Sequence, residues 1–254
     1  MASSSSPSLE VEDLYKRLNL EEESGGITVK AEEDGKKEGQ DFNWSLVGRF
    51  LTDRQINFTA MQNTLASIWR HVKGVCIKMI GPNLYLFQFF HELDVSRVIN
   101  DGPWTFDQHL LIFKSLELGM NPHQVPLFQV DFWIQVYDLP IGYMSERVAR
   151  DVGNFLGKFV EADSNNFTGI WRDYKRIRVS MDIRLPIKRR MKLKKIGEEW
   201  SWINFKYEKI PTFCFFCGVI GHFDKFCEKL FDYLDKSGKN SMVYGSEHHQ
   251  GELQ

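Results

Sequence analysis

The chain has only four cysteines among 254 residues, and three of them lie between Cys214 and Cys227. Cysteines this few and this unevenly placed exclude a disulfide framework and favour a reducing, intracellular setting. No stretch approaches the roughly 18 consecutive apolar residues of a membrane-spanning helix. Residues 1–8 are serine-rich and lack the basic start and apolar core of a secretion signal. We therefore expect no membrane association and no secretion.

Recognisable catalytic motifs are also missing. The sequence has no glycine-rich phosphate loop, no G-x-S-x-G nucleophile elbow and no H-E-x-x-H pair. His71, His91, His109 and His123 are scattered over different predicted elements, with no spacing that suggests a second metal site. These absences predict a binding protein with no catalytic residues and no small-molecule substrate.

The formal net charge of the chain is only -2, but its charged residues are unevenly distributed. Residues 1–40 carry ten acidic and five basic side chains and few apolar ones, which predicts a disordered acidic tail over residues 1–41. Residues 172–195 reverse the balance, with eleven basic side chains against two acidic ones. A basic segment of this kind favours a phosphate-bearing partner.

Hydrophobic periodicity predicts an α/β unit over residues 42–118. Its order is β-α-β-β-α-β, with Asn57 and Asp94 as the expected helix caps. The expected strands are Trp44–Leu51, Val75–Ile80, Leu84–Phe90 and Leu110–Phe113. This order is that of the ferredoxin-like split βαβ plan, which RNA-recognition modules (RRMs) share.

The third strand of this unit departs from the RRM pattern. Leu84 and Leu86 occupy the positions where an RRM presents rings that stack on bases. Tyr85, Phe87 and Phe89 share the opposite face and read as ordinary core. The fold is thus expected without its usual base-binding face.

A second small α/β unit is predicted over residues 131–209, after a linker at 119–130. We expect one helix, Ser145–Leu156, and no internal sequence repeat. The expected strands are Phe132–Tyr137, Lys158–Ala162, Tyr174–Leu185, Arg190–Lys194 and Glu199–Tyr207. The fold class is therefore α+β, and a zinc knuckle at 210–230 and a disordered tail at 231–254 complete the chain.

Four residues near the C-terminus carry the most specific signal. Cys214, Cys217, His222 and Cys227 have the spacing C-x2-C-x4-H-x4-C. Three thiolates and one imidazole make the closed tetrahedral set that structural zinc prefers. So short a loop cannot bury a core, and zinc binding of about 10–16 kcal/mol would fold it. These four residues are the predicted zinc ligands.

This segment resembles the retroviral Gag type of zinc knuckle. The resemblance implies that Phe215 and Phe223 contact unpaired bases, where stacking contributes roughly 1–3 kcal/mol per base. The alternative is that both rings pack the small domain or dock it onto the preceding sheet. Val219 and Ile220 stand where polar or basic residues are common in Gag-type knuckles. That departure, and the presence of a single knuckle, lower the expected affinity.

A wider resemblance extends over about residues 44–230. It rests on segments that include Leu46–Leu51, Asp101–Trp104, Phe132–Pro140, Tyr174–Val179 and Phe205–Cys214. These look like a plant family in which a domain of unknown function precedes a CX2CX4HX4C knuckle. The family occurs in host proteins and at the front of non-LTR retrotransposon polyproteins. The resemblance implies nucleic-acid binding and a retroelement origin.

Alternation along Lys175–Leu185 predicts a strand with one apolar face and one cationic face. A basic sheet face with interleaved tryptophans suits a single nucleic-acid strand, because cations follow the phosphates while rings stack on bases. The alternative is a solvated face that keeps the sheet soluble and its edges unpaired. The candidate contact residues are Arg176, Arg178, Arg184, Lys188, Arg189, Arg190, Lys192, Lys194, Trp200 and Trp202.

Together these patterns predict a zinc-dependent protein that binds single-stranded RNA or DNA with low sequence specificity. The alternative function is protein–protein interaction, including Gag-like self-association. The run Lys188–Lys195 also fits a nuclear-import signal, which favours the nucleus over the cytoplasm.

Overall fold

The computed structural model describes residues 44–237, apart from His71, Ile141, Met144, 168–171, Lys195, Ile196 and Glu198. The predicted acidic tail at 1–41 and the C-terminal residues 238–254 lie outside this described part. The described residues belong to one compact unit, Asp41–Gln254.

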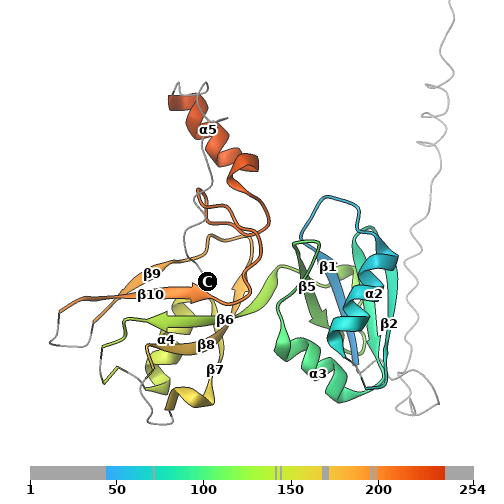
Figure 1. Ribbon diagram of the computed structural model, residues 1–254, viewed down its shortest axis with the longest axis horizontal. Coiled ribbons are helices and arrows are strands. Elements are labelled where there is room, and N and C mark those ends of the chain that lie inside the picture. Colours follow the sequence, from blue (N-terminus) through green and yellow to red (C-terminus); the bar gives the residue numbers. More distant parts are fainter. Residues whose placement is uncertain are drawn as a thin grey trace, which may run out of the picture. The chain divides into compact units, whose positions relative to one another are not determined.

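The first sheet has five antiparallel strands in the order β2-β3-β1-β5-β4 (Figure 1). Helix α2 (Phe58–Trp69) follows β1, and helix α3 (Glu92–Asp101) follows β3. The predicted β-α-β-β-α-β order is confirmed, and the short strand β4 is added at one edge. The strands are β1 (Ser45–Phe50), β2 (Val75–Gly81), β3 (Leu84–Phe89), β4 (Trp104–Phe106) and β5 (His109–Ser115).

Aromatic residues fill the space between this sheet and its helices. Tyr85, Phe87 and Phe89 are at most 2% exposed and pack with Met61 and Leu65 of α2, which confirms them as core. The side chain of Asn57 accepts a hydrogen bond from the backbone N–H of Ala60, as the predicted N-cap of α2 should.

The predicted cap of α3 is wrong. Helix α3 begins at Glu92, and the His91 ring accepts the capping hydrogen bond from Leu93 N–H. Asp94 lies inside the first turn, where it is buried. Its carboxylate accepts hydrogen bonds from the backbone N–H groups of Val72 and Lys73, at 2.8 and 3.0 Å. Instead of capping α3, the Asp94 carboxylate therefore stabilises the loop at Val72 and Lys73. The local sequence around Asp94 does not predict this long-range contact.

The second sheet repeats the strand order of the first. Its order is β7-β8-β6-β10-β9, again antiparallel throughout, with helix α4 (Glu146–Leu156) after β6. A turn between β8 and β9 takes the place of a second helix. The strands are β6 (Gln129–Tyr137), β7 (Lys158–Ala162), β8 (Tyr174–Asp182), β9 (Arg190–Leu193) and β10 (Ser201–Tyr207). The two sheets thus share a topology that the sequence does not show as a repeat.

The face of the first sheet that lies opposite its helices is buried. Val47, Leu110 and Ile112 are at most 1% exposed and belong to the same apolar core as Phe132 and Ile134 of β6. Leu84 packs against this core as well. The face on which an RRM stacks bases is here an internal packing surface, so Leu84 serves packing.

Two boundaries differ from the expectation. Strand β8 ends at Asp182, where a turn is closed by a hydrogen bond from Leu185 N–H to the Asp182 carbonyl, and Leu185 is 61% exposed. Alternation therefore stops before Arg184.

Helix α5 (Glu228–Ser237) occupies the start of the expected tail at 231–254. Within the described residues, short 3-10 helices are η2 (Pro122–Gln124), η3 (Ser164–Phe167) and η4 (Asp224–Phe226).

Among the helices of the described residues, none has the length and apolar character that crossing a membrane requires.

Candidate metal centre and nucleic-acid interface

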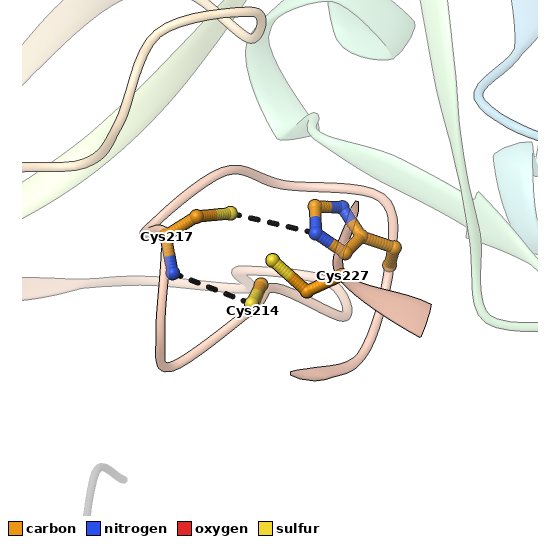
Figure 2. Close-up of side chains that lie close together, drawn as sticks. Cys214, Cys217 and Cys227 are labelled. Carbon is orange, nitrogen blue, oxygen red and sulfur yellow. Dashed lines mark hydrogen bonds between the residues drawn. The ribbon is translucent and has the colours of Figure 1, made fainter. Parts of the chain in front are cut away.

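The structure brings the four predicted zinc ligands together (Figure 2). One donor atom from each of Cys214, Cys217, His222 and Cys227 lies within 4.8 Å of every other. Cys217 Sγ and His222 Nε2 are 3.4 Å apart. Ligands that lie 2.0 to 2.3 Å from one zinc ion in a tetrahedron are separated by roughly 3.5 to 4 Å. The cluster therefore fits a single metal ion with four protein ligands.

Backbone turns create this arrangement. The N–H of Cys214 donates to the Val219 carbonyl at 2.9 Å, and the N–H of Gly218 donates to the Cys214 carbonyl at 2.8 Å. Gly218 and Gly221 have φ of 75° and 108°, which L side chains rarely adopt. The following turn η4 then brings Cys227 to the other ligands.

The thiols of the cluster differ in acidity. Burial raises the pKa of Cys214, but hydrogen bonds from the Cys217 backbone N–H and from neighbouring thiols outweigh burial and hold its pKa below the usual value. Burial and the nearby sulfur atoms raise the pKa of Cys217. The thiolate is the form that binds metal, so the hydrogen bonds that Cys214 accepts favour its metal-binding form.

Ile220 explains the departure from the Gag-type pattern. Its side chain is 4% exposed and belongs to the core that the two sheets share. Gly221 lies against Leu51 so closely that a Cβ at this position would be 2.7 Å from Leu51 Cδ2. The N–H of Ile187 donates to the Gly218 carbonyl at 2.9 Å. An apolar residue between the two glycines therefore docks the knuckle onto the α/β body.

This docking leaves the knuckle aromatics exposed. Phe215 is 70% exposed and Phe223 is 44% exposed, although Phe215 contacts Phe213 with ring centroids 4.7 Å apart. Sequence reasoning missed two further rings, Phe216 at 45% and Phe226 at 60% exposure. Lys225 Nζ lies 5.0 Å from the Phe226 ring centroid and 5.8 Å from that of Phe223, so a cation accompanies these rings.

On β8 and in the turn after it, the candidate arginines contact other groups of the protein. Arg176 pairs with Asp163 at 3.2 Å and Glu208 at 2.8 Å, and its guanidinium lies 3.9 Å from the Trp133 ring centroid. Arg184 pairs with Asp182 and covers the Phe128 ring. These charges are neutralised within the protein, which makes them poor phosphate contacts.

Arg178 is the least accessible of the candidates. Its side chain is 5% exposed and pairs with Asp131 at 3.5 Å and Glu161 at 3.2 Å. It also donates to Asn100 Oδ1 and to the Ile99 carbonyl, at 3.1 and 2.7 Å. Its burial removes Arg178 from the candidate interface and gives it a structural role.

We therefore predict that Arg178→Ala lowers the free energy of unfolding by about 2–3 kcal/mol, because the hydrogen bonds of a nearly buried guanidinium are lost while both carboxylates stay partly hydrated. Arg184→Ala, a change at an exposed pair, should leave the urea midpoint almost unchanged. Equal midpoints for the two variants would contradict this assignment.

The basic residues of β9 and β10 have a different environment. Arg190 and Lys192 lie 4.4 and 5.1 Å from the Trp202 ring centroid, and Lys194 lies 5.6 Å from that of Trp200. Trp200 is 62% exposed and Trp202 is 47% exposed. Within the described part of the chain, none of these cations forms an ion pair. We define the β9–β10 surface as Arg190, Lys192, Lys194, Trp200, Trp202 and Lys206.

Two further candidates flank this surface. Lys188 donates to the Phe155 carbonyl and lies 4.2 Å from the Phe155 ring centroid, so it is tied to the end of α4. Arg189 is exposed, and its carbonyl accepts a hydrogen bond from Phe205 N–H. Sequence reasoning missed Lys206, although alternation along β10 places it on the face that carries Trp202.

The fold and the ligand cluster define an α+β protein with a C-terminal zinc knuckle. Residues 38–124 match the family described as Domain of unknown function (DUF4283), and residues 181–229 match the family described as Zinc knuckle. The two matches follow the predicted order, with the domain of unknown function before the zinc knuckle, which confirms the predicted architecture.

One relative is an uncharacterized protein of Arabidopsis thaliana, which is 26% identical over 137 residues. The match covers 53% of this chain and 42% of that protein, so it spans less than half of the relative's length. Among solved structures, the first two RRM domains of yeast poly(U) binding protein match over 53% of this chain and 81% of that chain. The TM-score of this match is 0.22 and the identity is 10%.

Proposed function

We propose that this protein binds single-stranded nucleic acid, RNA or DNA, with low sequence specificity and in a zinc-dependent manner. The observation that carries the proposal is the β9–β10 surface, where cations without ion-pair partners among the described residues alternate with exposed tryptophans. Such a surface combines the phosphate attraction and the ring stacking that single strands require. The exposed knuckle ring Phe215 adds a second stacking contact.

Zinc is the metal that best suits the cluster, and its role in this proposal is structural. Three thiolates and one imidazole are typical zinc ligands, and a set of four protein ligands leaves no position for a catalytic water. The metal would hold the knuckle folded and keep its rings in place. We accordingly propose a binding function without catalysis.

A retroelement origin and a nuclear location are part of the same proposal. The first rests on the order of the two domains, and the second on the basic run at Lys188–Lys195, of which Lys188–Lys194 are described. Strand β9 takes up part of this run, so import would depend on the exposed side chains of Lys188 and Arg189.

The Phe215→Ala variant tests the knuckle's share in binding. We expect binding to a labelled single strand to weaken by roughly 1–3 kcal/mol in fluorescence anisotropy, with little change in salt dependence, because a stacking contact releases few counterions. Phe215→Tyr keeps a ring and should bind almost as wild type. Full affinity in folded, zinc-loaded Phe215→Ala would exclude Phe215 as a base contact.

A protein partner is the second candidate function, and exposed aromatics on and before α5 favour it. Phe226, Phe231 and Tyr233 are 60%, 44% and 56% exposed. If these rings mediate self-association, light scattering should show a mass above that of one chain, and Phe231→Ser with Tyr233→Ser should restore the monomer. A monomer at every concentration would exclude self-association.

A further inference from the structure

The outer face of the second sheet carries an aromatic pair outside the predicted interface. Tyr137 on β6 lies opposite Tyr174 on β8, and their ring centroids are 5.2 Å apart at an interplanar angle of 38°. On the other side, Tyr137 lies opposite Asn204 of β10, and Asn204 lies opposite Arg190 of β9. One row of side chains therefore crosses the sheet from the tyrosines to the β9–β10 surface.

This row faces away from the core. The residues that alternate with it, such as Val136, Ile177 and Ile203, are at most 2% exposed. Lys206 Nζ lies 4.9 Å from the Tyr137 ring centroid, which adds a cation beside the ring. Unlike the corresponding face of the first sheet, this part of the second sheet stays accessible, since Asn204 and Lys206 are exposed and both tyrosines are only partly buried.

The spacing suits neighbouring bases of one strand. Trp202 precedes Asn204 by two residues, and Asn204 pairs with Tyr137 across the strands. With strands about 4.8 Å apart and a rise of about 3.4 Å per residue, the backbones at Tyr137 and Trp202 are on the order of 8 Å apart. Large rings on both positions can then support two bases of the same strand.

An acceptor lies beside this aromatic pair. The exposed Asp138 carboxylate accepts a hydrogen bond from Asn204 Nδ2 at 2.6 Å, which fixes its position next to Tyr137. A carboxylate only accepts hydrogen bonds, and it repels phosphates, so a base edge is the part of a strand that it can contact favourably. Cytosine and adenine offer an exocyclic amino group to such an acceptor, whereas uracil and thymine present carbonyl oxygens at the equivalent position.

We infer that Tyr137 and Tyr174 hold one base of a bound single strand, and that Asp138 favours a base with an exocyclic amino group. This inference rests on the proposed nucleic-acid binding and deepens it. Low sequence specificity would then include a modest preference for amino-bearing over keto pyrimidines.

Cytosine and uracil oligomers of equal length provide the cleanest test, because the two bases have the same ring size and differ in this group. With the full zinc-loaded chain, anisotropy should show about threefold to tenfold tighter binding of the cytosine oligomer, the range of one modest hydrogen bond. Asp138→Asn should bring the ratio of the two affinities close to one, since an amide both donates and accepts. Tyr137→Ala should weaken binding of both oligomers by roughly tenfold, and Tyr137→Phe should retain the wild-type affinities.

The outcomes separate this inference from the proposed function. If both oligomers bind equally to the wild-type protein, or if Asp138→Asn leaves their ratio unchanged, the base preference is overturned while nucleic-acid binding stands. Wild-type affinity in folded Tyr137→Ala overturns the stacking site. If neither oligomer binds the folded protein, the proposed function fails and this inference fails with it.

Discussion

Replacing Arg190, Lys192 and Lys194 together with glutamine is expected to weaken binding of a single strand roughly tenfold or more at low salt. It should also flatten the salt dependence, because each lost phosphate contact removes counterion release with a slope of about 0.7. These three cations surround exposed tryptophans, and none has an ion-pair partner in the described part of the chain. Anisotropy titrations at several salt concentrations measure both effects.

A matched variant controls for net charge. Arg54, Lys73 and Lys78 are exposed cations of the first α/β unit, far along the sequence from the β9–β10 surface. Replacing these three with glutamine changes the net charge equally, yet it should leave the salt slope close to that of the wild type. Equal loss in both variants would mean that binding follows net charge alone and would remove the β9–β10 surface as a specific site.

Loss of the metal is expected to unfold the knuckle. Protein prepared without chelator should contain one zinc per chain by elemental analysis, and Cys217→Ser with His222→Ala should contain none. Zinc binding of about 10–16 kcal/mol is what folds so short a loop. Because Ile220 is buried in the shared core, its release should also expose apolar surface around Leu51 and increase binding of a hydrophobic dye. The strands of both sheets should remain, since each sheet buries its own apolar residues.

Cys76→Ser provides the control, because Cys76 is a free, half-buried cysteine on β2, outside the cluster. This variant should keep its zinc and its low dye binding. A full zinc content in the double variant, or a zinc-free wild-type protein, would refute the metal site.

Much of the fold could be predicted from the sequence, because local sequence patterns agreed with the tertiary structure. Alternation located β7, β9 and β10 to within two residues at each end, and Asn57 caps α2 as expected. The predicted helix Ser145–Leu156 is also present as α4, which begins one residue later with Ser145 as its N-cap. The metal site of the knuckle could also be predicted, since its four ligands lie within one short segment and are brought together by local turns.

The β8 arginines could not be interpreted from local sequence. Alternation correctly placed Arg176 and Arg178 away from the apolar face, but their partners lie far along the chain. Asp131 comes from β6, Glu161 from β7 and Glu208 from the segment after β10. The positive charges that the sequence shows on β8 are thus neutralised by carboxylates from neighbouring strands and the segment after β10, and the strand order is needed to identify these partners.

The role of Ile220 and the burial of the first sheet's outer face also could not be predicted from the local sequence. Val219 and Ile220 read as a weakened nucleic-acid contact, whereas the buried side chain of Ile220 docks the knuckle. The repeated strand order of the two sheets also escaped sequence comparison, because topology depends on which strands pair. Of the two equivalent outer faces, that of the first sheet is buried as core, and that of the second keeps accessible rings and cations.

Ultraviolet crosslinking can locate the residues that contact a bound single strand. The zinc-loaded full chain would be irradiated with a photoreactive single-stranded oligonucleotide, digested, and its crosslinked peptides identified by mass spectrometry. Crosslinks are expected in the peptides that contain Trp200 and Trp202 and in the knuckle peptide that contains Phe215. The absence of crosslinks under binding conditions, or crosslinks confined to α2 and α3, would contradict this expectation.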